Sequence, residues 1–387
     1  MLPLSCGKTL FENSPTLGAS LEARAIRTSY IEKPDTTSAI PGSVSDRFRE
    51  AFSPEVDSLF LDLQKRKEFS GTVLIARRGK IIHTGAYGYA DLKAKEELTT
   101  ESVFQLASVS KTFTATAILL LQQDGVLDID DKIRYYIPDF PYENMTIRHL
   151  LNHRSGLSRY MGLMHASWDK RVHMNYKDVL DYYIKNKPPL FFQPDKKFEY
   201  CNTNYVFLAA MVEYLSKKTF ADFLDERIFK PVGMESTWLC NYQERETRPN
   251  RTFSYQRTLR GYYKVEGDYL DGVFGDKGVY STVMDLYRFD RALAEGKLLN
   301  QKHLTESCLP GSPEEKDQNY GLGWRMKPFY PDLVYHFGWW HGYRTCFIRD
   351  LQAETTVIIL CNRDNRQKPI NFWYVYQFVN GWIGHYA

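Results

Sequence analysis

The 387-residue sequence has no run of 18 or more apolar residues, which excludes a helix that spans a membrane. Its six cysteines show no Cys-x-x-Cys or similar spacing, so neither a cysteine metal site nor a disulfide framework is indicated. The formal net charge is only +3, and no Lys/Arg stripe appears along the chain. Nucleic acid is therefore not expected as a partner.

The composition is that of a globular protein with a sizeable core, 43% hydrophobic and 25% charged. The aromatic content of 15% favours a cleft lined with rings. The length suffices for two domains, or for one domain interrupted by a large insertion. Cys346 and Cys361 stand in strand-like apolar runs and are expected to be small buried hydrophobes.

The order of periodic segments predicts the fold class. A helix over 46–69 and a hairpin over 71–85 open the globular part, and a helix over 108–123 follows, with Gly125 as its C-cap. Residues 129–272 are dominated by helix and loop, and the end of the chain returns to strands and a closing aromatic helix. These segments lie at 148–153, 176–185 and 205–215 for the middle helices, 320–325, 333–337, 344–348 and 354–361 for the strands, and 372–383 for the last helix.

We therefore predict an α/β (α+β) fold in which helices flank an antiparallel sheet built from both chain ends. Residues 46–128 and 273–387 would form the sheet domain, and 129–272 an inserted, mostly helical domain. Residues 1–45 are rich in Ser, Thr, Pro and Gly and are predicted to be a linker.

The motif with the clearest chemistry is Ser108-Val-Ser-Lys111, at the start of a hydrophobic helix. A serine hydroxyl becomes a good nucleophile only when a neighbouring group takes its proton. Positions i and i+3 share a helix face, so the lysine can reach the serine. The pattern recurs at Ser5–Lys8 and Ser167–Lys170, and by itself it also fits a helix N-cap serine with a solvated lysine.

Two later motifs supply the partners that such a pair needs: Tyr200-Cys-Asn202 and His336-Phe-Gly338, which runs into Trp339-Trp340. A second Tyr-x-Asn match at Tyr142 is expected to be a loop. The order Ser-x-x-Lys, Tyr-x-Asn, His-x-Gly resembles the serine β-lactamase and penicillin-binding-protein superfamily, and most closely its class C β-lactamase-like branch, which also holds DD-peptidases and esterases. The resemblance extends from about residue 50 to the C-terminus, and further blocks that carry it are 104–114, 146–157, 198–205 and 278–286.

The resemblance implies a role for each motif residue. Ser108 would be the acylated nucleophile, Lys111 would keep it deprotonable, and Tyr200 would shuttle protons and later activate water. A tyrosine, with an ordinary pKa near 10, can do this only beside cations, which Lys111 and His336 would supply. Asn202 would hold Lys111 and the acyl amide of the substrate.

The third motif would supply the oxyanion hole and a binding wall. The backbone N–H groups of Ser108 and Trp339 would face the oxyanion, and Gly338 would leave room for the substrate along the strand. The superfamily often has Lys-Thr-Gly here, whereas this chain has His336 and Phe337, which removes a hydroxyl donor for a β-lactam carboxylate. Trp339 and Trp340 add bulk suited to an apolar or aromatic acyl group, with one ring pointing to each side of the strand.

These observations predict a serine hydrolase that acts on a small-molecule or peptide ester or amide, with no cofactor and no metal. The alternative is a non-hydrolytic binder or sensor of the same fold, and a second enzymatic alternative is a cell-wall D-peptidase. His149 and His153 have the i, i+4 spacing of a metal pair but no adjacent glutamate, so a hydrogen-bonded structural role is expected for them.

The N-terminus leaves two interpretations open. Leu2 to Lys8 looks like the end of a bacterial lipoprotein signal, in which Cys6 would carry lipid and the linker would be the tether. The charged and apolar regions of such a signal are missing from this sequence, so a chance match is the other interpretation. The first predicts a periplasmic or membrane-anchored lipoprotein in a bacterium, and the second leaves the cytoplasm open.

Overall fold

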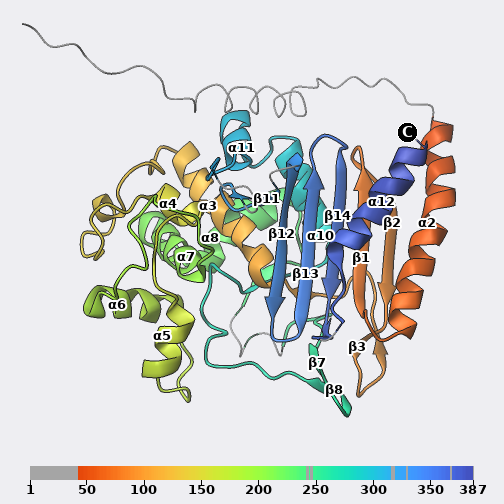
Figure 1. The fold of residues 1–387 in the computed structure, drawn as a ribbon, viewed down its shortest axis with the longest axis horizontal. Helices are drawn as coiled ribbons and strands as arrows, with labels where there is room; N and C mark the ends of the chain where they lie inside the picture. Colours follow the sequence, from red (N-terminus) through yellow and green to blue (C-terminus); the bar gives the residue numbers. More distant parts are fainter. Residues whose placement is uncertain are drawn as a thin grey trace, which may run out of the picture.

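The computed structural model describes residues 42–240, 244, 247–314, 319–327, 330–366 and 368–386. Its largest sheet has seven strands in the order β10-β11-β12-β13-β14-β1-β2, and every neighbouring pair in it is antiparallel (Figure 1). Strands from near both ends of the described chain meet where β1 pairs with β14. The predicted α+β fold is therefore confirmed. The strands of this sheet are β1 (Gly71–Arg77), β2 (Lys80–Tyr87), β10 (Asn319–Tyr320), β11 (Arg325–Lys327), β12 (Tyr330–Trp340), β13 (Tyr343–Asp350) and β14 (Thr355–Cys361).

Helices cover both faces of the sheet. On one face α2 (Gly42–Lys65) and α12 (Phe372–Tyr386) pack together over the strands, at the right of Figure 1. Val73 points into that layer, whereas Leu74 points into the opposite one, with α3 (Ser110–Gln123) and α10 (Val283–Ala294). Because both faces are covered, β14 is buried along its whole length and its sequence is a continuous apolar run.

The middle of the chain is a helical block with small sheets at its edge. Its helices are α4 (Ile147–Leu151), α5 (Tyr160–Ser167), α6 (Tyr176–Asn186), α7 (Asn202–Ser216) and α8 (Phe220–Leu224). The hairpin of β7 (Tyr255–Thr258) and β8 (Gly261–Lys264) was not predicted and extends at the lower edge of Figure 1. The other short strands are β3 (Tyr89–Asp91), β4 (Glu96–Glu97), β5 (Phe104–Gln105), β6 (Trp238–Leu239), β9 (Val279–Ser281) and β15 (Arg363–Asp364), and α11 (Gln301–Ser307) follows α10. The domain limits at 128/129 and 272/273 stay a prediction.

Two predicted elements need correction. The first helix begins at Gly42 rather than at residue 46. Its first four residues, Gly-Ser-Val-Ser, hold a single apolar side chain, so no helical period marked them in the sequence. The predicted strand over 320–325 is two strands, β10 and β11, joined by a turn in which Gly323 has φ +92. A Cβ at Gly323 would lie 2.5 Å from the side chain of Ala115, so this turn packs directly on α3.

The N-terminal predictions for Cys6 and most of the linker lie outside the described residues. Cys346 and Cys361 are fully buried in strands, as predicted. Within the described ranges, all cysteines are free thiols and no helix is both long and apolar enough to cross a membrane.

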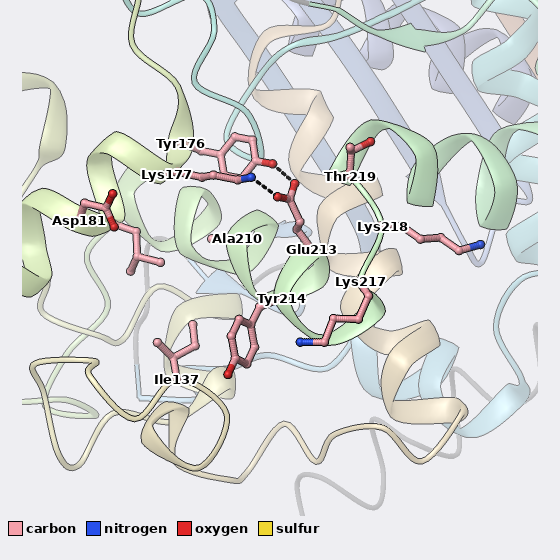
Figure 2. A pocket seen from close by; sticks show the side chains of 11 residues that line it. Ile137, Tyr176, Lys177, Asp181, Ala210, Glu213, Tyr214, Lys217, Lys218 and Thr219 are labelled. Atoms are coloured by element: carbon pink, nitrogen blue, oxygen red, sulfur yellow. Dashed lines mark hydrogen bonds and ion pairs between the residues drawn. The ribbon is translucent and has the colours of Figure 1, made fainter.

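A hollow of about 570 Å³ lies against α6 and α7 in the helical block (Figure 2). Glu213 points into it, accepts a hydrogen bond from the hydroxyl of Tyr176 and forms an ion pair with Lys177. Its lining contains no serine, cysteine or histidine. The carboxylate of Glu213 in this hollow is therefore already paired.

Candidate active site

Ser108 lies in a 3-10 turn, η1 (Ala107–Val109), that leads directly into α3. Ala107, just before it, has φ +49, a left-handed conformation that is strained for a residue with a Cβ. The carbonyl of Leu106 accepts a hydrogen bond of 2.6 Å from the hydroxyl of Thr345 on β13. The turn is thereby tied to the sheet, and the sheet fixes the position of Ser108.

Lys111 stands one turn further on, at the distance that the i, i+3 spacing predicts. Its Nζ lies 3.1 Å from Ser108 Oγ and donates a second hydrogen bond, of 2.7 Å, to the backbone carbonyl of Asp276. The lysine side chain is fully buried. These two bonds aim the amine at the serine. The carbonyl of Asp276 was not predicted, since nothing in its local sequence marks it as a partner.

Tyr200 lies beside this pair, just before α7 begins. Lys111 Nζ is 5.1 Å from the centre of its ring, and the guanidinium of Arg325 on β11 is 4.2 Å from the same point. Its hydroxyl is buried and has no hydrogen-bond partner among the described residues. A phenol whose ring lies close to two cations, and whose hydroxyl has no hydrogen-bond partner among the described residues, is available for proton exchange with a bound molecule.

Asn202 is the first residue of α7 and lines the same hollow as Ser108. Its Nδ2 is 4.0 Å from the sulfur of Met161, and its Oδ1 has no partner within the described ranges. Within the described ranges Lys111 Nζ donates to Ser108 and to the carbonyl of Asp276, and it forms no hydrogen bond with Asn202, contrary to expectation. The amide group of Asn202 is therefore available to a ligand.

Gly338 on β12 packs against the turn that carries the serine. A Cβ at this position would lie 2.3 Å from the carbonyl oxygen of Leu106 and 2.2 Å from the hydroxyl of Thr345. The room that glycine leaves on that side is thus filled by the backbone before Ser108. Glycine is required here because β12 and η1 approach so closely.

The residues around Gly338 divide between the hollow and the core. Phe337 and Trp339 line the hollow, and the indole N–H of Trp339 donates to Asp364 at 2.8 Å. Trp340 is half-buried, packs on the core and donates to Asp271 at 2.7 Å. The alternation expected for the tryptophan pair is thus present, and Trp339 is the one that faces the hollow.

His336 lies behind the hollow rather than in its lining. It is fully buried, and its Nε2 shares a hydrogen bond of 2.9 Å with the hydroxyl of Tyr320. Burial, reinforced by the nearby charges of Arg325 and Lys111, holds the pKa of His336 well below its ordinary value of 6.5. The ring is therefore neutral near neutral pH and does not supply the cation expected of it next to Tyr200.

The hollow has a volume of about 630 Å³ and opens above Ser108. Two arginines that were not predicted line it. Arg344 is paired with Asp364 at 2.5 Å, whereas Arg325 forms no ion pair with any described residue. No aspartate or glutamate lines the hollow, so its own charge is positive. The lining residues are Ser108, Tyr200, Asn202, Arg325, Phe337, Gly338, Trp339, Arg344, Pro369, Ile370, Asn371, Phe372 and Trp373.

The two histidines with metal-like spacing have structural roles. His149 closes a capping box with Thr146 at the start of α4. His153 is fully buried and accepts a hydrogen bond from the backbone N–H of Cys201, the residue between Tyr200 and Asn202. It therefore supports the segment that presents Tyr200.

One cluster in the described chain has the composition of a metal site: Asp268, Asp271 and His341, whose ligand atoms lie within 4.8 Å of one another. Both oxygens of Asp271 already accept hydrogen bonds, from Trp340 and from the backbone N–H of Asp268. The second oxygen of Asp268 lies 3.3 Å from His341. Donors of the protein itself thus occupy these carboxylate oxygens, and the cluster supports Trp340 through a hydrogen bond.

Comparisons with known proteins agree with this geometry. The family model described as Beta-lactamase matches residues 56–378. A curated penicillin-binding protein of Bacillus subtilis (strain 168) is 37% identical over 328 residues, which are 80% of this chain and 71% of that protein.

Solved structures show the same fold. D-amino acid amidase from Ochrobactrum anthropi SV3 superposes with a TM-score of 0.64 at 28% identity, over 78% of this chain and 88% of the amidase. A penicillin-binding protein from Bacillus halodurans superposes with a TM-score of 0.70 at 24% identity, over 79% of this chain and 95% of that one. The chain belongs to the Beta-lactamase family, within the β-lactamase and transpeptidase-like superfamily of serine hydrolases.

Proposed function

We propose that this chain is a serine hydrolase that cleaves an ester or amide through an acyl-enzyme on Ser108. The observation that carries the proposal is the fully buried Lys111, whose Nζ lies 3.1 Å from Ser108 Oγ at the edge of an open hollow. A buried cation is costly unless it is paired, and Lys111 has only two oxygen partners, one of them the serine. That arrangement suits a site in which negative charge develops on the serine oxygen.

In the first step, Ser108 Oγ forms a bond to the carbonyl carbon of the substrate, and its proton passes to the phenolate oxygen of Tyr200, which becomes the neutral phenol. The negative charge moves to the carbonyl oxygen, which the backbone N–H groups of Ser108 and Trp339 would hold. When the bond to the leaving group breaks, Tyr200 returns the proton to that group. The products are an acyl ester on Ser108 and a free alcohol or amine.

In the second step, water attacks the acyl ester. Tyr200 takes a proton from this water, the carbon–oxygen bond to Ser108 breaks, and the proton goes back to the serine oxygen. The side chains of Lys111 and Arg325 lie beside the serine oxygen and the tyrosine ring, where positive charge favours the negative states of both groups. The tyrosine in the base position is the basis for proposing a class C-like mechanism.

The hollow also suggests the kind of substrate. Phe337 and Trp339 offer an apolar wall, and Asn202 a free amide for an acyl amide group. The likeness to an amidase and to penicillin-binding proteins favours amides and peptides alongside simple esters. Such substrates and the lipoprotein-like segment around Cys6 fit a periplasmic location, which we propose together with the activity.

A covalent trap tests the proposal directly. The protein is incubated with a fluorophosphonate, a chromogenic cephalosporin and short-chain nitrophenyl esters, and any adduct is located by mass spectrometry. We expect an adduct on Ser108 and turnover of at least one ester. An adduct with no turnover of any substrate would favour the non-hydrolytic binder, and neither adduct nor turnover would refute the hydrolase.

A further inference from the structure

A basic hollow that shares no lining residue with the hollow at Ser108 lies between the end of α2 and the β7–β8 hairpin. It has a volume of about 620 Å³ and none of its lining residues is acidic. Five of the lining residues are cationic, and they come from three separate parts of the chain: Lys65, Lys67, Arg257, Arg260 and Arg363. The fold thus assembles a concentration of positive charge that the sequence does not show as a stripe.

Arg363 makes this hollow different from a set of solvated surface lysines. Its side chain is only 9% exposed, its Nε has no hydrogen-bond partner among the described residues, and no ion pair is formed by its guanidinium. The group rests on the ring of Tyr262, at 4.6 Å from the ring centre. A nearly buried guanidinium without an acidic partner is costly, and an anion in the hollow would offset that cost.

The acidic groups near the hollow are used elsewhere. Asp364, next to Arg363, turns to the other side and pairs with Arg344 and Trp339. Glu68 lies within ion-pair distance of Arg66 and Lys368. The five cations of the hollow are therefore left for a ligand from outside the chain.

The tip of the hairpin adds an apolar element. Leu259 is 99% exposed, and it stands between Arg260 and the strand that carries Arg257. An exposed leucine at a projecting turn has no packing role in the folded chain. A leucine tip with cations around it matches the interface of a membrane, where the apolar group enters the acyl boundary and the cations meet phosphate groups.

We propose that the β7–β8 hairpin and the basic hollow form a docking site for an anionic lipid membrane. Leu259 inserts at the interface, while Arg363 and the four other cations bind the phosphate of lipid headgroups. The site is separate from the active site, so it does not depend on the hydrolase proposal.

Vesicle flotation with the 387-residue chain tests this site. Vesicles of phosphatidylcholine alone are compared with equimolar phosphatidylcholine and phosphatidylglycerol, at low and high salt. We expect binding only to the anionic vesicles, with loss at high salt, because charges near a surface are screened within a Debye length. Equal binding to both vesicle types, or no binding to either, would overturn the proposal.

Variants separate the two parts of the site. Arg257→Gln with Arg260→Gln should weaken binding by roughly fivefold for each charge removed. Leu259→Ser should weaken it by roughly tenfold with no change of charge. Lys185→Gln with Lys196→Gln, two exposed lysines of the helical block, is the matched control and should leave binding unchanged. If the control weakens binding as much as the hairpin pair does, the site is refuted and net charge explains the binding.

Arg363→Lys keeps the charge at the buried position, and Arg363→Gln removes it. We expect weaker vesicle binding only for the glutamine variant, with the circular dichroism spectrum of both variants unchanged. If glutamine disturbs folding, the Leu259→Ser comparison still decides. Soluble polyphosphate that binds equally to the wild type and to Leu259→Ser, while vesicles do not bind, would show a soluble-anion site and would refute the membrane assignment.

Discussion

Ser108–Lys111 and Ser167–Lys170 share one spacing in the sequence, yet only the first pair is in contact. Lys111 is buried and reaches Ser108 at 3.1 Å. The hydroxyl of Ser167 instead donates to the carbonyl of Leu163, and Lys170 meets the ring of His165 at the surface. The second pair fails because α5 ends at Ser167, so the lysine has already left the helix.

The comparison shows what the four-letter pattern omits. An i, i+3 pair becomes neighbours only where the helical path continues through both residues. It becomes reactive only where the lysine is buried and partner groups from other segments surround the serine, as β12 and Tyr200 do at Ser108. The predictions below test whether that difference in surroundings is a difference in chemistry.

The largest effect is expected from removing the two serines in turn. Ser108→Ala should lower nitrophenyl ester turnover by about 10³-fold or more, because no other group can form the acyl-enzyme. Ser167→Ala should leave turnover and the fluorophosphonate adduct unchanged, since this hydroxyl only caps its own helix. Steady-state kinetics and intact-mass spectrometry check both variants. Equal activity in Ser108→Ala would place the chemistry elsewhere.

Replacing the lysines should separate activity from stability. Lys111→Met should lower kcat by roughly 10²- to 10³-fold, the usual contribution of one group that stabilises developing negative charge. Its melting temperature should hold or rise, because an apolar side chain of similar length avoids burying a charge. Lys170→Met should change neither quantity. A fall in melting temperature that matches the activity loss would mean that Lys111 is mainly structural.

A smaller effect is expected at Arg325, which lines the hollow and forms no ion pair with any residue that the structure describes. Arg325→Gln should raise KM by roughly tenfold for substrates with a carboxylate near the scissile bond, because one charge-assisted contact is lost. Neutral esters should keep their KM. Arg344, which already has Asp364 as its partner, is the comparison: Arg344→Gln should show no such selectivity. A matching rise in KM for neutral and anionic substrates would contradict a role in charge selection.

Much of the fold could be predicted because its physical causes are local. β14 is an apolar run because helices cover both faces of the sheet. The helix after Ser108 is apolar along most of its length because it is buried in the core. The structure also brings the motif residues together: Ser108 and Tyr200 line one hollow, and Lys111, buried beneath it, lies close to both.

What could not be predicted depends on contacts between distant segments. Arg325 reaches Tyr200 only because β11 pairs with β12, and no local pattern marks this arginine. His336 has the right position in its motif, but the depth of its burial behind Tyr320 is a tertiary fact. The basic hollow could not be predicted for the same reason, because its cations are spread over three segments.

The smallest expected effect is the dependence of the free energy of unfolding on pH, for which the buried His336 is compared with the exposed His165. The pKa of His336 is held well below its ordinary 6.5, mainly by burial, so an unfolded chain binds a proton there that the folded chain does not. His153 is shifted in the same direction, also mainly by burial. The stability from these rings is complete above about pH 6.5 and is lost as the pH falls toward their folded values.

Urea unfolding from about pH 8 to about pH 5 should therefore show a falling free energy of unfolding below about pH 6.5. His336→Gln, which keeps a hydrogen-bonding group near Tyr320, should make the slope shallower by up to about 1.4 kcal/mol per pH unit. His165→Gln is the matched control, because it makes the same change of imidazole to amide at an exposed position beside Lys170. An equal change of slope in both variants would mean that burial behind the hollow is not what holds His336 neutral.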